Sequence, residues 1–255
     1  MKFSGKSGVT IVITSCGRFD LLERTLKSLD EFNTYPVRKV IITEDSGSDK
    51  VFDVIPAAWA QHVQVFVNNP KLGQLKSIDL AYTSVETEWV FHCEDDWQFY
   101  RPGFIEDSML LLKEDKQALQ VWLRSFAHDL QVHSPYVYLG ERKQLESVVY
   151  YELMSRKEEW QGFSFNPGLR RLVDYKLHAP YQQFAGEKAL SKLYAEENRY
   201  ALILESDAVL HTGFGEHVVS SEEKYKKKRR KNIAKLKNLV FFILGIAAGA
   251  VLHYV

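Results

Sequence analysis

Apolar and polar residues alternate along the first part of the chain in blocks whose lengths suit strands and helices. Four short apolar runs, rich in β-branched or aromatic residues and ended by polar turns, predict buried strands at residues 9–14, 37–43, 63–67 and 89–93. Helical spacing of apolar residues predicts helices from an N-cap at Asp20, over residues 50–60, and through Ser77, Leu80, Ala81 and Val85. This alternation predicts an α/β fold with a mostly parallel sheet, whose ligands lie at the carboxyl ends of the strands.

The second half of the chain continues this pattern less regularly. A helix is predicted at residues 104–113, a strand at 118–123, a helix at 187–196 and a strand at 201–204. Residues 125–180 are aromatic and irregular, so no definite element is predicted there. Residues 213–221 have the composition of a linker.

The composition suits one sizeable folded domain with an appendage. The 255 residues are 45% hydrophobic and 26% charged, which allows a proper core but leaves little room for two full enzymatic domains. Only Cys16 and Cys93 are present, too few for a disulfide framework, and the N-terminus lacks the long apolar stretch of a signal peptide. We therefore expect reduced thiols and a cytoplasmic main domain.

The formal charge of zero hides an asymmetry along the chain. Residues 224–237 hold nine of the 33 Lys and Arg and no acid, so elsewhere 24 bases face 33 acids. Nucleic-acid-binding surfaces need clustered Lys and Arg to contact phosphates. The acidic main body therefore argues against a nucleic acid as partner.

The C-terminal residues have the pattern of a membrane anchor. Residues 239–255 contain no formally charged side chain apart from the titratable His253, and they follow the basic run 226–231. Seventeen helical residues extend roughly 25 Å, the short end of a bilayer span, and a basic flank stays on the cytoplasmic side. We expect residues 1–215 to form the catalytic domain, 216–237 a linker and basic juxtamembrane segment, and 238–255 a segment that anchors the protein across a membrane or along its surface.

Three adjacent carboxylates, Glu94, Asp95 and Asp96, follow the fourth predicted strand directly. Three anions at one strand end repel each other unless a cation or donor groups compensate them. Mg²⁺ or Mn²⁺ bridging a diphosphate needs only one or two protein carboxylates, which makes a divalent metal the natural partner. The alternative is a solvated acidic turn without a ligand.

Together, four polar turns make a more specific pattern. Residues 14–18, 44–49, 69–73 and 94–96 occur in an order and spacing that resemble family 2 and related GT-A glycosyltransferases. Residues 44–49 resemble the family's Asp-Asp-Gly-Ser-x-Asp turn, with Glu44 in place of the first Asp, and residues 94–96 resemble its Asp-x-Asp metal motif. The resemblance implies a GT-A fold, a mostly parallel Rossmann-like sheet flanked by helices, over about residues 9–215.

The resemblance also implies roles for individual residues. Asp45 would accept a hydrogen bond from the nucleotide base, Glu94 and Asp95 would contact ribose or donor sugar, and Asp96 would bind the metal. The residues expected to bind the nucleotide sugar are Thr14, Ser15, Arg18, Glu44, Asp45, Lys71, Gly73, Glu94 and Asp95. Read by itself, Asp45 could equally be a turn-capping residue.

Two downstream segments add to this resemblance. Residues 184–191 resemble a family segment whose second acid is the general base of inverting members, and Glu187 stands at that position. Residues 211–215 resemble a late His-x-Gly-x-Gly element, which makes His211 a candidate second metal ligand. Glu187 could instead be an acid favoured in a first helical turn, and His211 a structural histidine. Trp97, Trp160 and Phe163 are weaker candidates for stacking on sugars.

These features predict an inverting glycosyltransferase that uses Mn²⁺ or Mg²⁺ and a nucleoside-diphosphate sugar donor. The expected acceptor is a saccharide or a lipid-linked saccharide at a membrane. A sugar nucleotidyltransferase is the first alternative, although residues 15–18 form a poor version of its Gly-rich basic loop. A non-catalytic, membrane-tethered sugar-binding protein is the second, and it would not need both Asp96 and Glu187.

Overall fold

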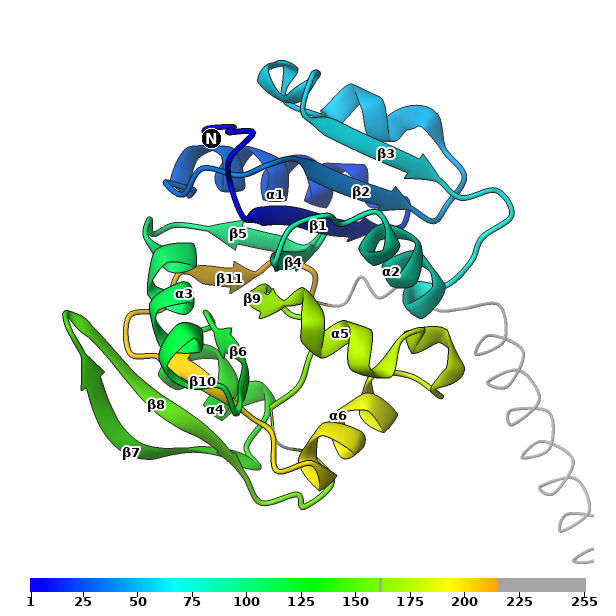
Figure 1. Cartoon of the computed structure of the whole chain (residues 1–255). Helices are drawn as coiled ribbons and strands as arrows, with labels where there is room; N and C mark the ends of the chain where they lie inside the picture. Colours follow the sequence, from blue (N-terminus) through cyan, green and yellow to red (C-terminus); the bar gives the residue numbers. More distant parts are fainter. Residues whose placement is uncertain (161, 215–255) are drawn as a thin grey trace, which may run out of the picture. The chain divides into compact units, whose positions relative to one another are not determined.

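The computed structural model describes residues 1–160 and 162–214 and is organised around a five-stranded sheet of order β3-β2-β1-β4-β9. β1, β2, β3 and β4 are parallel to one another, and β9 runs antiparallel to β4 at the edge (Figure 1). The strands of this sheet are β1 (Val9–Ser15), β2 (Val40–Glu44), β3 (Val63–Val67), β4 (Trp89–Glu94) and β9 (Gly168–Arg171). The predicted mostly parallel sheet is therefore present.

Helices cover both faces of this sheet because β1 is apolar on both sides. Ile11 and Ile13 pack in one core with the leucines of α1 (Phe19–Phe32), whereas Val12 packs in a second core with Ile78 of α2 (Gln74–Thr83). Residues that alternate along a strand point to opposite faces, so the two cores lie on opposite sides of the sheet. The remaining longer helices are α3 (Phe104–Glu114), α5 (Leu172–His178) and α6 (Glu187–Glu196).

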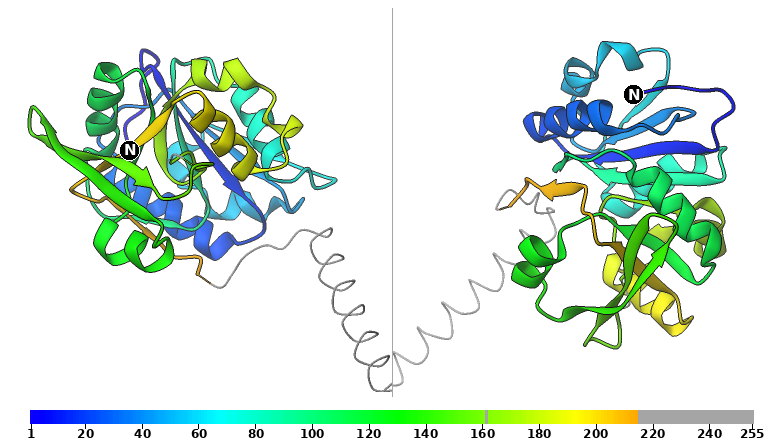
Figure 2. Two further views of the ribbon diagram at one scale, coloured as in Figure 1. Left: turned by 90° about the horizontal axis from the view of Figure 1, so that it is seen from below. Right: turned by 90° about the vertical axis from the view of Figure 1, so that its left-hand side faces the viewer.

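The second half of the domain forms two smaller sheets. β6 (Ala118–Trp122), β10 (Tyr200–Leu204), β8 (Val148–Ser155) and β7 (Val137–Leu145) make a mixed sheet in the order β6-β10-β8-β7. β7 and β8 form a hairpin that extends away from the neighbouring elements (Figures 1 and 2). β5 (Trp97–Phe99) pairs with β11 (Val209–His211), which returns the end of the domain to the acidic turn after β4.

Several predicted elements need correction. Residues 50–60 form two short 3₁₀ helices, Asp49–Val54 and Ala57–Trp59, because Pro56 interrupts a continuous helix. Asp20 lies in the first turn of α1, whose N-cap position is Arg18. The second strand begins at Val40, after the irregular residues 37–39.

The segment without predicted elements, residues 125–180, contains regular structure. It holds β7, β8, β9 and α5, together with a π-helical turn at Phe126–Leu130 and the short α4 (Gln131–His133). Most of β7 is exposed or half-buried, so its sequence lacks the alternation of a strand that packs on a core. The predicted boundaries at 215 and 237 and the predicted anchor at 238–255 lie outside the described residues. None of the helices within the described part of the chain is long and apolar enough to cross a membrane.

Candidate active site at the carboxyl ends of the central strands

The parallel register brings the predicted polar turns to one edge of the sheet. Thr14 lies between Thr43 of β2 and Glu94 of β4, and Ser15 is paired with Glu44. Parallel strands end at the same edge, so turns far apart in sequence become neighbours there. The candidate site is built on this edge.

Asp95 is held from three directions. The Arg18 guanidinium forms a salt bridge with its carboxylate, which also accepts hydrogen bonds from Arg18 Nε at 3.3 Å and from the Cys16 amide at 3.2 Å. Thr25 of α1 donates its hydroxyl to the Asp95 carbonyl at 2.9 Å. Burial raises the pKa of Asp95 to about 6, although the charge of Arg18 opposes that rise. Asp95 is thus fixed against the first helix.

Asp96 joins the triplet to the last strand of the domain. Its Oδ2 lies 2.8 Å from Arg18 Nη1 and 3.3 Å from His211 Nε2, and its carbonyl accepts the Thr212 amide at 2.8 Å. Any Cβ on Gly213 would clash with this carboxylate. Burial opposes ionisation of Asp96, but its pKa is lowered because the His211 hydrogen bond and the Arg18 charge outweigh it.

Glu94 is the least compensated carboxyl of the triplet. Its Oε1 accepts a hydrogen bond from Gln74 Nε2 at 3.1 Å. Removal of this carboxyl from water raises its pKa to about 8, and the negative charges of Asp96, Glu187 and Asp95 add to the rise. The triplet therefore carries more negative charge than Arg18 compensates, which favours a further cation at this edge.

Glu44 and Asp45 hold the loops around the site. Glu44 accepts the Ser15 hydroxyl at 2.6 Å, the Gly17 amide at 2.9 Å and the Ser46 amide at 2.8 Å. Asp45 is buried, and its carboxylate accepts four hydrogen bonds from residues 68–77. Its donors are the Asn68 side chain, the Leu72 and Gly73 amides and the Ser77 hydroxyl. Both acids are thus occupied by the chain itself, and the predicted contact of Asp45 with a nucleotide base stays a prediction.

Lys71 and Gly73 lie in the loop before α2. The Lys71 ammonium is 3.1 Å from Cys16 Sγ, so this loop meets the β1–α1 turn at the edge of the site. Gly73 has φ of 89°, a conformation that favours glycine, and its amide points at Asp45. The structure therefore brings all the predicted nucleotide-sugar residues to one region.

Glu187 begins α6 on the other side of this region. Its Oε2 accepts the Phe165 amide at 2.9 Å. Burial raises its pKa, whereas the Phe165 hydrogen bond and the charges of Arg170 and Arg124 counteract that rise. The charge of Glu187 also helps to raise the pKa of Glu94, so the two carboxyls lie close enough to interact electrostatically.

The three aromatic candidates do not form a sugar-stacking surface. Trp97 and Phe163 are only 1% and 3% exposed, so both belong to the core. Trp160 is half-buried and packs edge to face against Trp122 and Tyr136. The structure gives no support for stacking by Trp97 or Phe163.

Asp96 and His211 offer an oxygen and a nitrogen donor that suit a divalent cation. Asp96 Oδ1 is buried and accepts no hydrogen bond from the part of the chain that the structure describes, and His211 Nε2 lies beside the same carboxylate. No group of three or more His, Cys, Asp or Glu suited to a metal is found within residues 1–160 and 162–214. A cation held here would therefore need oxygen atoms of a substrate or of water, as Mg²⁺ commonly does.

Sequence reasoning missed several residues that support the site. Thr25 and Gln74 lie on helices and hold Asp95 and Glu94, and Arg124 and Arg170 lie near Glu187. Arg170 could have been noticed as one of two adjacent arginines between Leu169 and Leu172. The local sequence carries no comparable signal for Thr25 or Gln74.

Comparison with known families defines the class of this domain. Residues 10–185 match glycosyl transferase family 2, most of the described chain. The chain therefore belongs to glycosyl transferase family 2 and carries a glycosyltransferase domain of the GT-A type, as the sequence resemblance predicted. A comparison with curated protein sequences finds no match.

Solved structures share this fold at low sequence identity. The 1–349 fragment of TarS from S. aureus is 15% identical with a TM-score of 0.56, covering 84% of this chain and 61% of its own. The same fragment in complex with UDP-GlcNAc is 14% identical with a TM-score of 0.57, and the match covers 88% and 63%. The mannosyltransferase PcManGT from Pyrobaculum calidifontis, in complex with GDP-Man and Mn²⁺, is 13% identical with a TM-score of 0.56, covering 77% and 55%. The chain thus spans less than two thirds of each of these proteins.

Proposed function

We propose that this protein transfers a sugar from a nucleoside-diphosphate sugar to an acceptor hydroxyl with inversion at the anomeric carbon. The observation that carries the proposal is the acidic triplet after β4, in which Asp96 is held between Arg18 and His211, together with Glu187, whose charge interacts with that of Glu94. An inverting transfer needs an electrostatic partner for the leaving diphosphate and a base for the acceptor on the opposite face of the sugar.

The donor is proposed from the edge of the sheet and from the similar structures. Residues 14–18, 44–45 and 71–73 surround the site that the parallel strands create, where α/β folds bind nucleotides. TarS is described in complex with UDP and UDP-GlcNAc, and PcManGT with GDP-Man. These complexes support a nucleotide-sugar donor of the same class here.

Asp96 and His211 are proposed to hold Mn²⁺ or Mg²⁺ together with the donor diphosphate. When bound, the ion supplies positive charge to the leaving group. Asp96 would contribute Oδ1, which accepts no hydrogen bond from residues 1–160 and 162–214, and His211 would contribute Nε2, which lies 3.3 Å from Asp96 Oδ2. Arg18 contributes a second, fixed positive charge against Asp95 and Asp96.

Glu187 is proposed as the general base. Its carboxylate takes the proton of the acceptor hydroxyl while that oxygen bonds to the anomeric carbon and the bond to the diphosphate oxygen breaks. The Phe165 amide orients the carboxylate at 2.9 Å. The raised pKa makes Glu187 a stronger base than an ordinary glutamate while leaving it ionisable.

A panel of nucleotide sugars tests this proposal with the full-length protein. We expect Mn²⁺-dependent release of a nucleoside diphosphate from one donor, slow with water and faster with saccharide acceptors. Asp96→Ala should abolish both release and metal-dependent donor binding. Release of pyrophosphate from a nucleoside triphosphate and a sugar phosphate would instead indicate a nucleotidyltransferase, and binding without turnover a sugar-binding protein.

We further propose that the protein acts at a membrane on a saccharide or lipid-linked acceptor, with the catalytic domain in the cytoplasm. The support is the basic run 226–231 followed by the apolar residues 239–255. Full-length protein should remain with membranes through a high-salt wash, whereas a variant without residues 239–255 should be released, because basic contacts are screened by salt. Release of full-length protein by salt alone would contradict insertion and indicate a surface helix.

A further inference from the structure

Arg170 is a buried cation in β9 without a carboxylate partner among the described residues. It is 5% exposed, and no salt bridge to it occurs within residues 1–160 and 162–214. Its Nε has no hydrogen-bond partner in the same part of the chain. The nearby Asp174 is engaged by Arg171 and Arg199, each at 2.9 Å. A buried charge of this kind is costly and calls for a reason.

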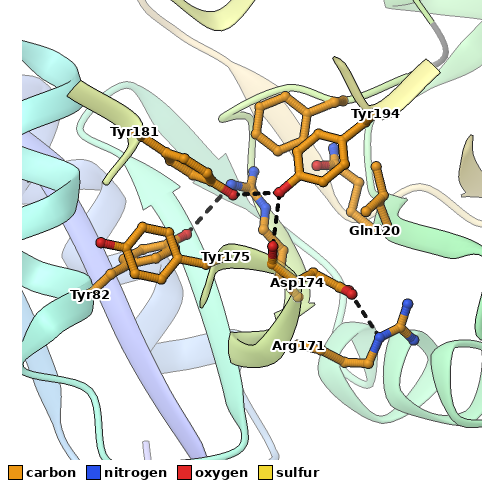
Figure 3. Close-up of a pocket in the computed structure, with 10 residues that line it drawn as sticks. Tyr82, Gln120, Arg171, Asp174, Tyr175, Tyr181 and Tyr194 are labelled. Carbon is orange, nitrogen blue, oxygen red and sulfur yellow. Dashed lines mark hydrogen bonds and ion pairs between the residues drawn. The ribbon is translucent and has the colours of Figure 1, made fainter. Parts of the chain in front are cut away.

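The groups in direct contact with the Arg170 guanidinium are neutral. Its Nη1 lies 3.5 Å from the Tyr82 hydroxyl, and its guanidinium lies over the rings of Phe163 and Phe165. Burial raises the pKa of Tyr82, and burial together with the Arg170 charge holds the pKa of His92 well below its usual value. Figure 3 shows the adjoining pocket, where the Tyr181 and Tyr194 hydroxyls bond to each other at 2.8 Å.

Arg170 is connected to Glu187 through one short turn. Its Nη2 donates to the carbonyls of Ser164 and Asn166, the latter at 3.2 Å. Between these two residues lies Phe165, whose amide donates to Glu187 Oε2 at 2.9 Å. The guanidinium therefore fixes both sides of the amide that orients the carboxylate.

We propose that Arg170 is a positioning residue for Glu187, which holds the 164–166 turn in place and keeps the Glu187 carboxylate ionised. This inference rests on the proposed role of Glu187 as general base. The turn is the geometric part of the role, and the uncompensated guanidinium charge is the electrostatic part. The buried positive charge of Arg170, which has no salt bridge among the described residues, then favours the ionised form of the Glu187 carboxylate.

Other charged groups near Glu187 do not replace Arg170. Arg124 is already paired with Asp129 through two contacts at 2.7 and 2.6 Å. Lys188 is exposed, and its ammonium lies 3.6 Å from Glu159. Glu94 is an acid whose own pKa is raised to about 8, in part by the charge of Glu187, so it supplies no positive charge to Glu187. Removal of the Arg170 charge should therefore raise the pKa of Glu187.

Three variants of the full-length protein separate the two parts of this role. Arg170→Met removes charge and hydrogen bonds, Arg170→Lys keeps the charge, and Arg171→Met is the matched control. Arg171 is the next buried arginine of β9, but it pairs with Asp174 and with carbonyls of residues 112–118. Its loss should lower thermal stability without changing the titration of Glu187.

The readouts are the pH dependence of kcat and the titration of the Glu187 carboxyl by NMR of ¹³C-labelled glutamate, assigned by its absence in Glu187→Gln. In Arg170→Met, Glu187 should titrate at higher pH, and kcat should fall several-fold more at about pH 6 than at about pH 8. Arg170→Lys should titrate like wild type and lose kcat equally at both pH values. An unchanged Glu187 titration in Arg170→Met, or the same shift in Arg171→Met, overturns the proposal.

These outcomes remain distinct from failure of the proposed function. If no donor and acceptor pair gives transfer, the function proposal fails, while the NMR titration still decides whether Arg170 controls the Glu187 charge. If Arg170→Met does not fold, Arg170→Lys decides. In Arg170→Lys, which keeps the charge but not the guanidinium hydrogen bonds, reduced kcat with an unchanged Glu187 titration supports the role, and wild-type kcat overturns it.

Discussion

Asp45 and Glu187 are both carboxylates of the candidate site, but the protein surrounds them differently. Asp45 accepts four hydrogen bonds of 2.7–3.2 Å from one continuous segment, residues 68–77. Glu187 accepts the Phe165 amide at 2.9 Å, and its pKa is also lowered by the Ser164 side chain and by charges, among them that of the buried Arg170. The Asp45 carboxylate organises the loop before α2. The Glu187 carboxylate is oriented by the protein but can still accept a hydrogen bond or a proton from a substrate.

This difference distinguishes a structural role for Asp45 from the proposed catalytic role of Glu187 within one site. A carboxylate saturated by donors fixes the backbone around it, and removal of the carboxylate leaves those donors buried and unpaired. A carboxylate with few donors and a raised pKa takes up a proton more readily than an ordinary glutamate. Substitution of Glu187 should therefore lower kcat, whereas substitution of Asp45 should first lower the free energy of unfolding.

The largest effect is expected for Glu187→Gln. The amide keeps the shape of the side chain but cannot accept a proton, so kcat should fall by about a hundredfold to ten-thousandfold. Donor affinity should remain near wild type, measured by calorimetry with Mn²⁺ and the donor. Glu196→Gln, at the exposed end of the same helix, is the control and should leave kcat unchanged. Loss of donor binding in Glu187→Gln would make Glu187 a binding residue and remove the contrast.

Asp45→Ala should act on stability first. It leaves the donors of residues 68–77 without their acceptor and should lower the free energy of unfolding by about 2–3 kcal/mol, measured by denaturant titration. Donor affinity should fall as the loop before α2 loosens. Asp53→Ala, at an exposed position of the following 3₁₀ helix, is the control. An unfolding free energy equal to wild type would show that Asp45 does not organise this loop.

Gly213→Ala sharpens the comparison at Asp96. A Cβ at this position would push against the Asp96 carboxylate, so the His211 contact and the proposed cation site should both be displaced. We expect an increase of about tenfold in the Mn²⁺ concentration needed for half-maximal activity. Gly5→Ala adds a Cβ where no atom lies within 4 Å and should have no effect. Equal Mn²⁺ dependence in both variants would argue against a cation at Asp96.

The smallest effect is expected for Glu94→Gln. The pKa of Glu94 is raised from 4.5 to about 8, so ionisation of the folded protein costs stability as pH rises between these values. The variant avoids that cost. Without metal or donor, it should melt at most roughly 2–4 °C higher than wild type above about pH 8, with a much smaller difference near pH 5.

Calorimetric melting curves of wild type, Glu94→Gln and the exposed control Glu88→Gln measure this difference. A melting-temperature gain that is independent of pH would show that packing, and not the charge of Glu94, is responsible. A gain confined to low pH would reverse the sign of the argument. Either result would contradict the conclusion that burial and nearby negative charges oppose the ionisation of Glu94.

Local sequence patterns were enough to predict the central parallel strands, the helices after β1 and β3, and the turns that carry the acidic residues. These are local features, because alternation of apolar residues and polar strand ends is visible within a few neighbouring positions. The four parallel strands and α6 agree with the predicted ranges within a few residues. Asp45 and Asp96 follow parallel strands whose carboxyl ends meet at one edge, whereas only the family resemblance assigned Glu187 to the site.

The contacts that fix Asp45, Asp96 and Glu187 became visible in the three-dimensional structure alone. The pairing of β5 with β11 brings His211 to Asp96, and the loop after β3 brings four donors to Asp45. The β7–β8 hairpin escaped prediction because most of β7 is not buried and therefore has no hydrophobic alternation. Arg170 and Arg171 are adjacent in sequence, yet one supports the turn at Glu187 and the other pairs with Asp174. Contacts between distant segments depend on the whole packing arrangement, which no local pattern encodes.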